Sequence, residues 1–122
     1  MKAASVVALM LMLASCDGLP AFSERGTGNG SSATFRLSAG ISRITWEAQD
    51  REPFFGCLFG VSLESPMPDP LAPFRMIVQT EIMRVDPRGR ISGSLLTPNL
   101  VAGEYSLRYL GDQPCDWSVA VS

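Results

Sequence analysis

The 122-residue sequence contains no histidine and a single lysine, Lys2. Without histidine there is no Ser-His-Asp or Cys-His arrangement and no imidazole ligand for a metal ion. With no lysine after Lys2, Schiff-base and Ser-Lys catalysis are excluded from the rest of the chain. The Cys-x-x-Cys spacing of thioredoxin-like and zinc sites is also missing. These absences predict a protein that is not an enzyme and has neither a cofactor nor a metal site.

Long hydrophobic runs are missing from the N-terminal region as well. The apolar segment 3–13 follows Lys2 and is shorter than the roughly 20 residues of a transmembrane helix. Its length suits the hydrophobic region of a secretory signal. It ends in Leu13-Ala14-Ser15-Cys16, which resembles the lipobox of bacterial lipoproteins. The resemblance implies a signal peptide over residues 1–15, cleavage before Cys16, and acyl chains on Cys16 that anchor the protein to a membrane of the cell envelope.

An ordinary secretory signal and an uncleaved anchor are the alternatives to this interpretation. In enterobacterial lipoproteins an Asp in the place of Asp17 resembles the signal for inner-membrane retention, but the sequence leaves the inner and the outer membrane open. The domain would lie in the periplasm or at the cell surface. Residues 16–33 are rich in Gly, Ser and other small residues and are predicted to be a flexible tether.

Positive charge is scarce after Lys2. Nine arginines stand against twelve acidic residues, so the chain without Lys2 carries a net charge of −3. A mildly acidic surface argues against a nucleic-acid partner, which needs a basic patch, and against electrostatic docking on anionic lipid. The partners that remain are a membrane, reached through the lipid, and a protein or a glycan.

Cysteine is rare, and its count is informative. There are three cysteines, an odd number for an exported protein. If Cys16 carries lipid, Cys57 and Cys115 remain as a pair, and export permits a disulfide between them. Two buried free thiols are the alternative. A bridge would close a loop of about 58 residues and stabilise the fold by roughly 4 kcal/mol in the chain-entropy model.

Helical periodicity is also absent, and alternation of apolar and polar residues takes its place. Residues 34–122 are predicted to form one all-β domain, an antiparallel sandwich or partly closed barrel of seven or eight strands with one disulfide. Gly56 and Gly60 are predicted to mark bulges or places where another backbone approaches. The expected strands cover 34–37, 41–48, 55–63, 74–85, 91–96, 105–109 and 115–121.

Proline and turn signals divide these strands. Four prolines make 65–73 a stiff, extended loop. A switch of apolar face predicts a bulge near Ile82-Met83 in the long strand that follows. Asp86-Pro87-Arg88-Gly89 has the residue preferences of a type I turn, which predicts a hairpin between 74–85 and 91–96.

Two C-terminal segments resemble exported β-sandwich modules. Leu100-Val101-Ala102-Gly103-Glu104-Tyr105-Ser106-Leu107 is similar to a strand pattern of bacterial extracellular modules, including the pre-peptidase C-terminal type. Cys115-Asp116-Trp117-Ser118-Val119 resembles the last strand of small exported sandwiches. The resemblance implies a domain that binds or packs rather than one that catalyses.

The remaining side chains with chemical potential are carboxylates and aromatics. The acidic candidates for a catalytic pair are predicted to be solvated, and the candidate calcium ligands Asp112 with Asp116, and Asp69, lack a known ligand spacing. Trp46 and Trp117 are predicted to be core residues, with a carbohydrate- or peptide-binding stripe as the alternative. The acidic candidates are Glu47, Asp50, Glu52, Glu81 and Asp86.

A contact surface is predicted at Phe54, Met67, Pro68 and Asp69. Adjacent Phe54 and Phe55 would point to opposite faces of a strand, which would expose one of them beside the proline-rich loop. The first hypothesis for function is therefore a lipid-anchored, non-catalytic binding or assembly module. The alternative is an inhibitor of an exported hydrolase, a protease or a lysozyme, with the stiff 65–73 loop as the inserted segment.

Overall fold

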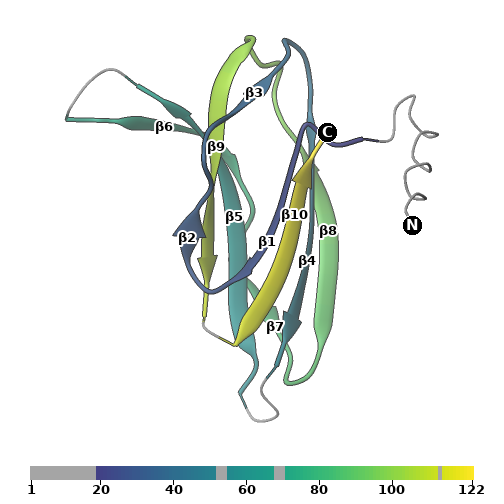
Figure 1. Ribbon diagram of the computed structural model, residues 1–122. Coiled ribbons are helices and arrows are strands. Elements are labelled where there is room, and N and C mark those ends of the chain that lie inside the picture. Colours follow the sequence, from purple (N-terminus) through teal and green to yellow (C-terminus); the bar gives the residue numbers. More distant parts are fainter. Residues whose placement is uncertain (1–18, 52–54, 68–70, 113) are drawn as a thin grey trace, which may run out of the picture.

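The computed structural model describes residues 19–51, 55–67, 71–112 and 114–122, and these form a sandwich of two antiparallel sheets (Figure 1). The predicted all-β sandwich is confirmed, with ten strands among the described residues. The strands are β1 (Phe22–Thr27), β2 (Gly30–Ser31), β3 (Phe35–Leu37), β4 (Arg43–Asp50), β5 (Cys57–Pro66), β6 (Phe74–Gln79), β7 (Met83–Val85), β8 (Arg90–Leu96), β9 (Gly103–Gly111) and β10 (Cys115–Val121).

The two sheets differ in how regular they are. The first has the order β1-β10-β4-β8. In the second, β9 and β5 pair along the centre; short β2 and β3 share the free edge of β9, and β6 and β7 share that of β5. No helix is present in the described ranges, so none of them contains one that could cross a membrane.

Alternating side chains fill the space between the sheets. The inward rows of β5, β9 and β10 carry large apolar groups at every second residue, in the predicted alternation, and small residues between them on β5 and β9 are buried as well. Trp117 stacks on Tyr109 with ring centroids 3.9 Å apart, which confirms its place in the core. The buried members of these rows are Phe59, Val61, Leu63, Tyr105, Leu107, Tyr109, Cys115, Trp117, Val119 and Val121.

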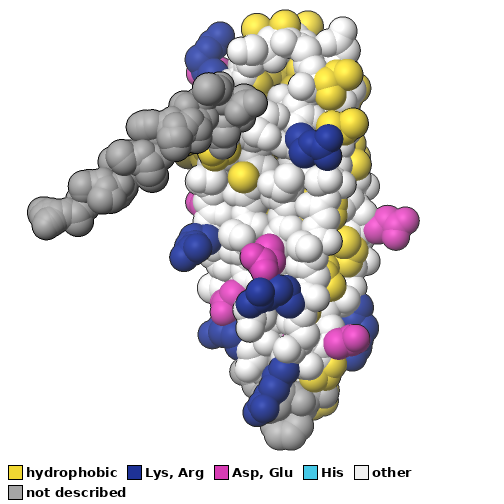
Figure 2. All heavy atoms as spheres, turned by 90° about the vertical axis from the view of Figure 1, so that its right-hand side faces the viewer, with side chains coloured by type: hydrophobic (Ala, Val, Ile, Leu, Met, Phe, Trp, Pro, Cys, Tyr) yellow, Lys and Arg dark blue, Asp and Glu magenta, His cyan; other side chains and the backbone are white. Residues whose placement is uncertain are grey.

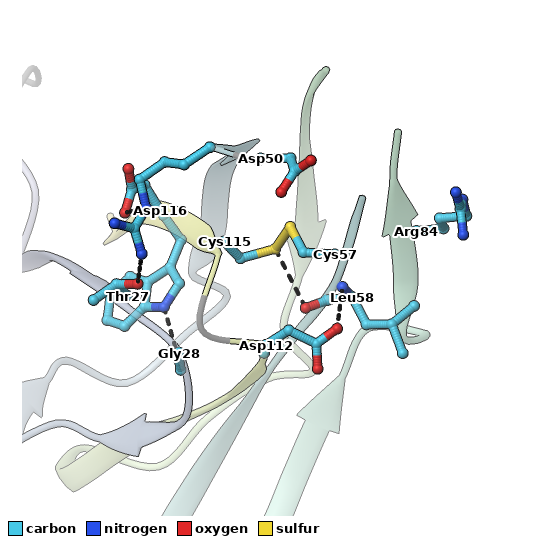
Figure 3. The surroundings of a disulfide bond; sticks show 12 residues. Thr27, Gly28, Asp50, Cys57, Leu58, Arg84, Asp112, Cys115 and Asp116 are labelled. Atoms are coloured by element: carbon cyan, nitrogen blue, oxygen red, sulfur yellow. Dashed lines mark hydrogen bonds and ion pairs between the residues drawn. A yellow bond between two sulfur atoms is a disulfide. The ribbon is translucent and has the colours of Figure 1, made fainter. Parts of the chain in front are cut away.

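A disulfide joins the two sheets. Cys57 begins β5 in the second sheet and Cys115 begins β10 in the first, and their Cα atoms lie 5.6 Å apart (Figure 3). Both residues are buried. The side chain of Asp112 accepts a hydrogen bond from the Leu58 amide at 3.1 Å, which fixes the turn between β9 and β10 beside the bridge. The predicted pairing is therefore confirmed.

The structure differs from the predicted tether over residues 22–31. Instead of a flexible coil, Phe22–Thr27 pairs along the whole length of β10, and Gly30–Ser31 pairs with β9. The phenyl ring of Phe22 stacks on Phe35 at a centroid distance of 4.3 Å. The composition of this segment predicted a coil because the segment itself is poor in apolar residues. It forms strands because it pairs with a sheet whose apolar residues lie on other strands.

Two glycines in this region are in contact with Trp117. A Cβ on Gly26 would lie 2.8 Å from the edge of the indole ring, so only glycine leaves room for the tryptophan. The indole Nε1 donates to the Gly28 carbonyl oxygen at 2.9 Å. The small residues that indicated a linker are therefore needed to pack a core side chain.

The predicted hairpin between 74–85 and 91–96 is wrong. The long strand divides at Thr80–Ile82 into β6 and β7, both paired with β5, whereas β8 pairs with β4 in the other sheet. The break itself, rather than a bulge near Ile82-Met83, accounts for the change of face. A register shift in the pairing of β5 with β6 occurs instead between Leu63 and Glu64.

The turn at Asp86-Pro87-Arg88-Gly89 carries the chain from one sheet to the other. The Gly89 amide donates to the Asp86 carbonyl oxygen at 2.7 Å, as in a β-turn. Arg88 has a φ of 57°, which belongs to a type II turn rather than the predicted type I turn. Its amide donates to the side chain of Asp50, which is 2% exposed and ends β4.

Candidate functional site

The β5–β6 arm, defined here as residues 64–67 and 71–76, projects from the upper left of the sandwich in Figure 1. Pro66 pairs with Phe74, and the Met67 amide donates to the Pro73 carbonyl oxygen at 2.7 Å. The arm forms because β5 and β6 continue their pairing past the region where the first sheet covers the second. Beyond Glu64, which also pairs with Ser106 of β9, the two strands of the arm pair only with each other among the described residues.

Large apolar side chains are exposed along the arm. Phe74 is 48% and Met76 52% exposed, and Met67 is 41% exposed after the end of β5. The next segment carries Leu71, which is 92% exposed. Several exposed apolar side chains on one projecting strand pair indicate a surface that contacts something else.

An ion pair supports the base of the arm. Arg108 on β9 donates to both carboxylate oxygens of Glu64, from Nε at 2.8 Å and from the guanidinium end at 3.3 Å. The hydrogen bond to Glu64, together with its charge, raises the pKa of Arg108. The guanidinium carbon also lies 5.9 Å from the centroid of the Phe74 ring. The bidentate pair and the ring contact fix the direction of the arm.

The structure describes one of the four predicted contact residues. Met67 lies in the arm, whereas Phe54, Pro68 and Asp69 lie outside the described residues. Phe55 and Met67 flank opposite ends of the ten-residue strand β5, a span of roughly 33 Å. The described residues therefore do not join these two segments into one surface.

Phe74 and Met76 were missed as surface residues. The sequence places them with Val78 on one face of the expected strand 74–85, and the register shift in β5–β6 and the end of the sandwich leave them exposed. The signal in the sequence was their closeness to four prolines, because a strand that leaves such a loop begins away from the core.

The outer face of the first sheet is the second large surface. Figure 2 shows it as mostly small polar side chains and backbone, with scattered Arg and acidic side chains, the acidic ones mainly in its lower half. Arg90 pairs with Glu47 at 3.1 Å and Arg51 with Asp116 at 3.0 Å. Its two depressions, of about 510 and 870 Å³, are wide open.

This face lacks an aromatic stripe within the part of the chain that the structure describes. Trp117 points into the core, and Trp46 shares the inward side of β4 with the buried residues Ile44 and Ala48. The structure thus places both tryptophans in or against the core. They do not form the exposed carbohydrate- or peptide-binding stripe that was the alternative prediction.

The acidic candidates are dispersed. Asp86 pairs with Arg84 at 3.5 Å, and Asp112 and Asp116 are bonded to Leu58 and Arg51 respectively. Among the described residues, no group of three His, Cys, Asp or Glu side chains could hold a metal ion. Glu52 and Asp69 lie outside these residues.

No protein-family model matches the sequence, and no curated protein matches it. Solved structures that are similar to this one include the following three. A chain of the T13 IBDV viral particle has 12% identity and a TM-score of 0.47, over 84% of this chain and 29% of its own. TmCBM61 in complex with beta-1,4-galactotriose has 12% identity and a TM-score of 0.45, over 82% and 68%. The GH115 4-O-methyl-alpha-glucuronidase BtGH115A has 15% identity and a TM-score of 0.46, over 88% and 15%. At this level of similarity none of them assigns a function.

Proposed function

We propose that this protein is a lipid-anchored, non-catalytic binding or assembly module of a bacterial cell envelope, and that the β5–β6 arm is its contact surface. The observation that carries the proposal is the exposure of Phe74 and Met76, which share one face of a strand pair that projects beyond the core, with Met67 exposed on its other face. Several exposed apolar side chains on one projecting element mark a site of protein interaction.

The cysteine count supports the anchor. Cys57 and Cys115 bond to each other, so Cys16 is the one cysteine left over in the chain. A leftover cysteine directly after three residues of lipobox type is the position that a lipoprotein acylates. Mass spectrometry of the mature N-terminus tests this directly, and an unmodified start at any other residue contradicts it.

The chemistry of the arm favours a protein partner over a glycan. Met67 and Met76 are unbranched and adapt to irregular surfaces, and Phe74 adds an aromatic face held by Arg108. Glycan recognition needs polar groups beside an aromatic ring that are available to bond sugar hydroxyls, whereas the polar groups beside Phe74, Arg108 and Glu64, are bonded to each other. We therefore place a protein partner first.

A photocrosslinking experiment in intact cells tests the arm. A photoreactive amino acid at Met76 should give one reproducible adduct, which Phe74→Ser should abolish. The matched control is the same label at Leu58, which is 45% exposed near the opposite end of β5. Equal adducts at both positions, or none at Met76, would rule out the arm as the contact surface.

Inhibition of an exported hydrolase, a protease or a lysozyme, is the second candidate function. The observation that favours it is the Met67–Pro73 hydrogen bond, which holds the base of a proline-rich loop in one shape before binding. Purified protein should then slow one enzyme of such a panel, and a variant with residues 67–73 replaced by a two-residue turn should not. If the unaltered protein slows none of them, this candidate fails.

A further inference from the structure

The chain enters the sandwich at a defined end. The Ala21 amide donates to the Val121 carbonyl oxygen at 2.7 Å, and Arg43 exchanges two backbone hydrogen bonds with the C-terminal Ser122. The start of β1, the end of β10 and the start of β4 therefore meet at the same end, which is at the top of Figure 1. Anything attached before Ala21 is held next to this end.

Three large aliphatic side chains are exposed at this end. We name Ile41, Leu96 and Val101 the Ile41 cluster; they are 65%, 53% and 77% exposed. Leu19, on the segment that enters the sheet, is 74% exposed. A single exposed aliphatic residue is ordinary, but several on neighbouring loops form an apolar surface.

Hydrogen bonds hold the loops of the Ile41 cluster together. Gly40 and Leu100 exchange two backbone bonds of 3.0 and 2.8 Å, and the Thr97 amide donates to the Ser42 carbonyl oxygen at 2.9 Å. The Tyr105 hydroxyl donates to the Val101 carbonyl oxygen at 2.6 Å. The loops β3–β4 and β8–β9 thus present the cluster on a fixed backbone, with Leu100 buried beneath it.

The length of chain before Ala21 identifies what covers this surface. Because Ala21 is already bonded to the sheet and β1 begins at Phe22, only five peptide units separate Cys16 from Ala21, a reach of at most about 17 Å. Resting on the proposed lipid anchor at Cys16, we infer that the Ile41 cluster lies in the interfacial region of the bilayer that the anchor enters. The sandwich is then a domain seated on the membrane by one end, rather than one carried above it on a flexible spacer.

The charged side chains at this end are consistent with a membrane contact made by the apolar side chains of the Ile41 cluster. Arg36 is 3.8 Å from Glu104 and so is paired, and Arg43 donates to the Ser94 hydroxyl at 3.1 Å. No basic cluster is formed there by the described residues, and the chain after Lys2 is acidic. Interfacial aliphatic groups add to the affinity of the acyl chains by partitioning into lipid.

Depth-dependent fluorescence quenching tests the inference. Mature protein purified from its own envelope, with its N-terminal mass measured, is reconstituted into phosphatidylcholine vesicles with or without brominated acyl chains. Val101→Trp should lose fluorescence in the brominated vesicles and shift its emission to the blue. Leu58→Trp, at the opposite end, is the matched control and should keep its fluorescence. The unaltered protein supplies the signal of Trp46 and Trp117.

The outcomes separate the inference from the proposal on which it rests. A protein that carries lipid on Cys16 but shows equal quenching of the two variants overturns the seated orientation alone. A chain without lipid on Cys16 overturns both. Quenching of Val101→Trp that is lost when Ile41→Ser is added supports the inference. A blue shift without bromine quenching shows that a second copy or another protein covers the cluster, and contradicts it.

Discussion

Gly56, just before β5, has a φ of 78°, a backbone conformation that side chains with a Cβ rarely adopt. A Cβ there would also overlap the carbonyl oxygen of Val85. We expect Gly56→Ala to lower the free energy of unfolding by about 2 kcal/mol or more, since it adds backbone strain to a steric clash. Urea denaturation followed by tryptophan fluorescence measures the change.

Gly103 is the matched control for this substitution. It begins β9, and no atom lies within 4 Å of the Cβ that alanine would add. Gly103→Ala should change the free energy of unfolding by less than about 0.5 kcal/mol. A loss of the same size at both positions would mean that the effect comes from glycine in general and not from the conformation of Gly56.

Tyr109 makes the stability of the fold sensitive to alkaline pH. Burial of the phenol, together with its 2.6 Å hydrogen bond to Glu24, raises the pKa of Tyr109 above 10.0. Because the folded-state pKa is raised, the stabilisation is complete below the unfolded value and is lost as the pH rises beyond it. We expect the free energy of unfolding to fall progressively above about pH 10.

Tyr109→Phe removes both the hydroxyl and its titration. It should cost about 1 kcal/mol near neutral pH, through the lost hydrogen bond, and should make the decline above about pH 10 shallower. Unfolding by urea between pH 8 and pH 11 compares the two proteins, and an identical decline in Tyr109→Phe would assign the pH dependence to other groups.

The positions of individual residues were predicted well where the alternation of apolar and polar residues determines which side chains are buried. Trp117 and the Cys57–Cys115 pair lie where the period-2 pattern put them, because one face of each strand must be buried. The approach of another backbone at Gly56 was also predicted correctly. Gly60 differs, since a Cβ there would lie at an ordinary 3.5 Å from the Glu81 carbonyl oxygen.

At the scale of elements, the disulfide is a covalent cross-link between side chains of the two sheets. It connects β5 to β10 across 58 residues of sequence, so it restricts the unfolded chain strongly. Replacing both Cys57 and Cys115 by alanine should lower the free energy of unfolding by about 4 kcal/mol in the chain-entropy model. Urea unfolding of the double variant, beside the parent protein with and without reductant, measures it. A double variant as stable as the oxidised parent would contradict this account.

The connections between strands were harder to predict than the strands. Alternation reports which side of a strand is buried, but it does not report which sheet the strand joins. The turn at Asp86–Gly89 could close a hairpin or cross between sheets, and the positive φ of Arg88 with its bond to buried Asp50 selects the crossing. These are tertiary contacts that local sequence does not contain.

The candidate site was predicted only in part for a similar reason. The proline-rich segment contains Met67, whose contact role stays a prediction, and the exposure of Phe74 and Met76 depends on where the first sheet stops covering the second. The point where this coverage ends depends on how two sheets pack together, and the sequence of a single strand does not indicate it. The arm as a surface therefore emerges from the assembled sandwich.

At the scale of the whole molecule, β1 decides where the folded domain begins. Composition placed the start at residue 34, but β1 lines β10, and Glu24 and Gly28 accept hydrogen bonds from Tyr109 and Trp117. A chain of residues 34–122 would lose these bonds and expose the edge of β10. We expect its free energy of unfolding to be lower by about 4 kcal/mol or more than that of residues 19–122, a large part of the stability of a small domain.

Near-ultraviolet circular dichroism and urea unfolding of the two chains check this expectation. A third chain, residues 22–122, is the control, because it removes Leu19 and the Ala21 hydrogen bond but keeps β1, and it should match residues 19–122 within about 1 kcal/mol. If residues 34–122 were as stable as residues 19–122, β1 would be dispensable. The segment could then detach and act as a long tether, so that the distance from Cys16 to the domain would no longer be limited to five peptide units. The lipid anchor would then no longer keep the end with the Ile41 cluster close to the membrane.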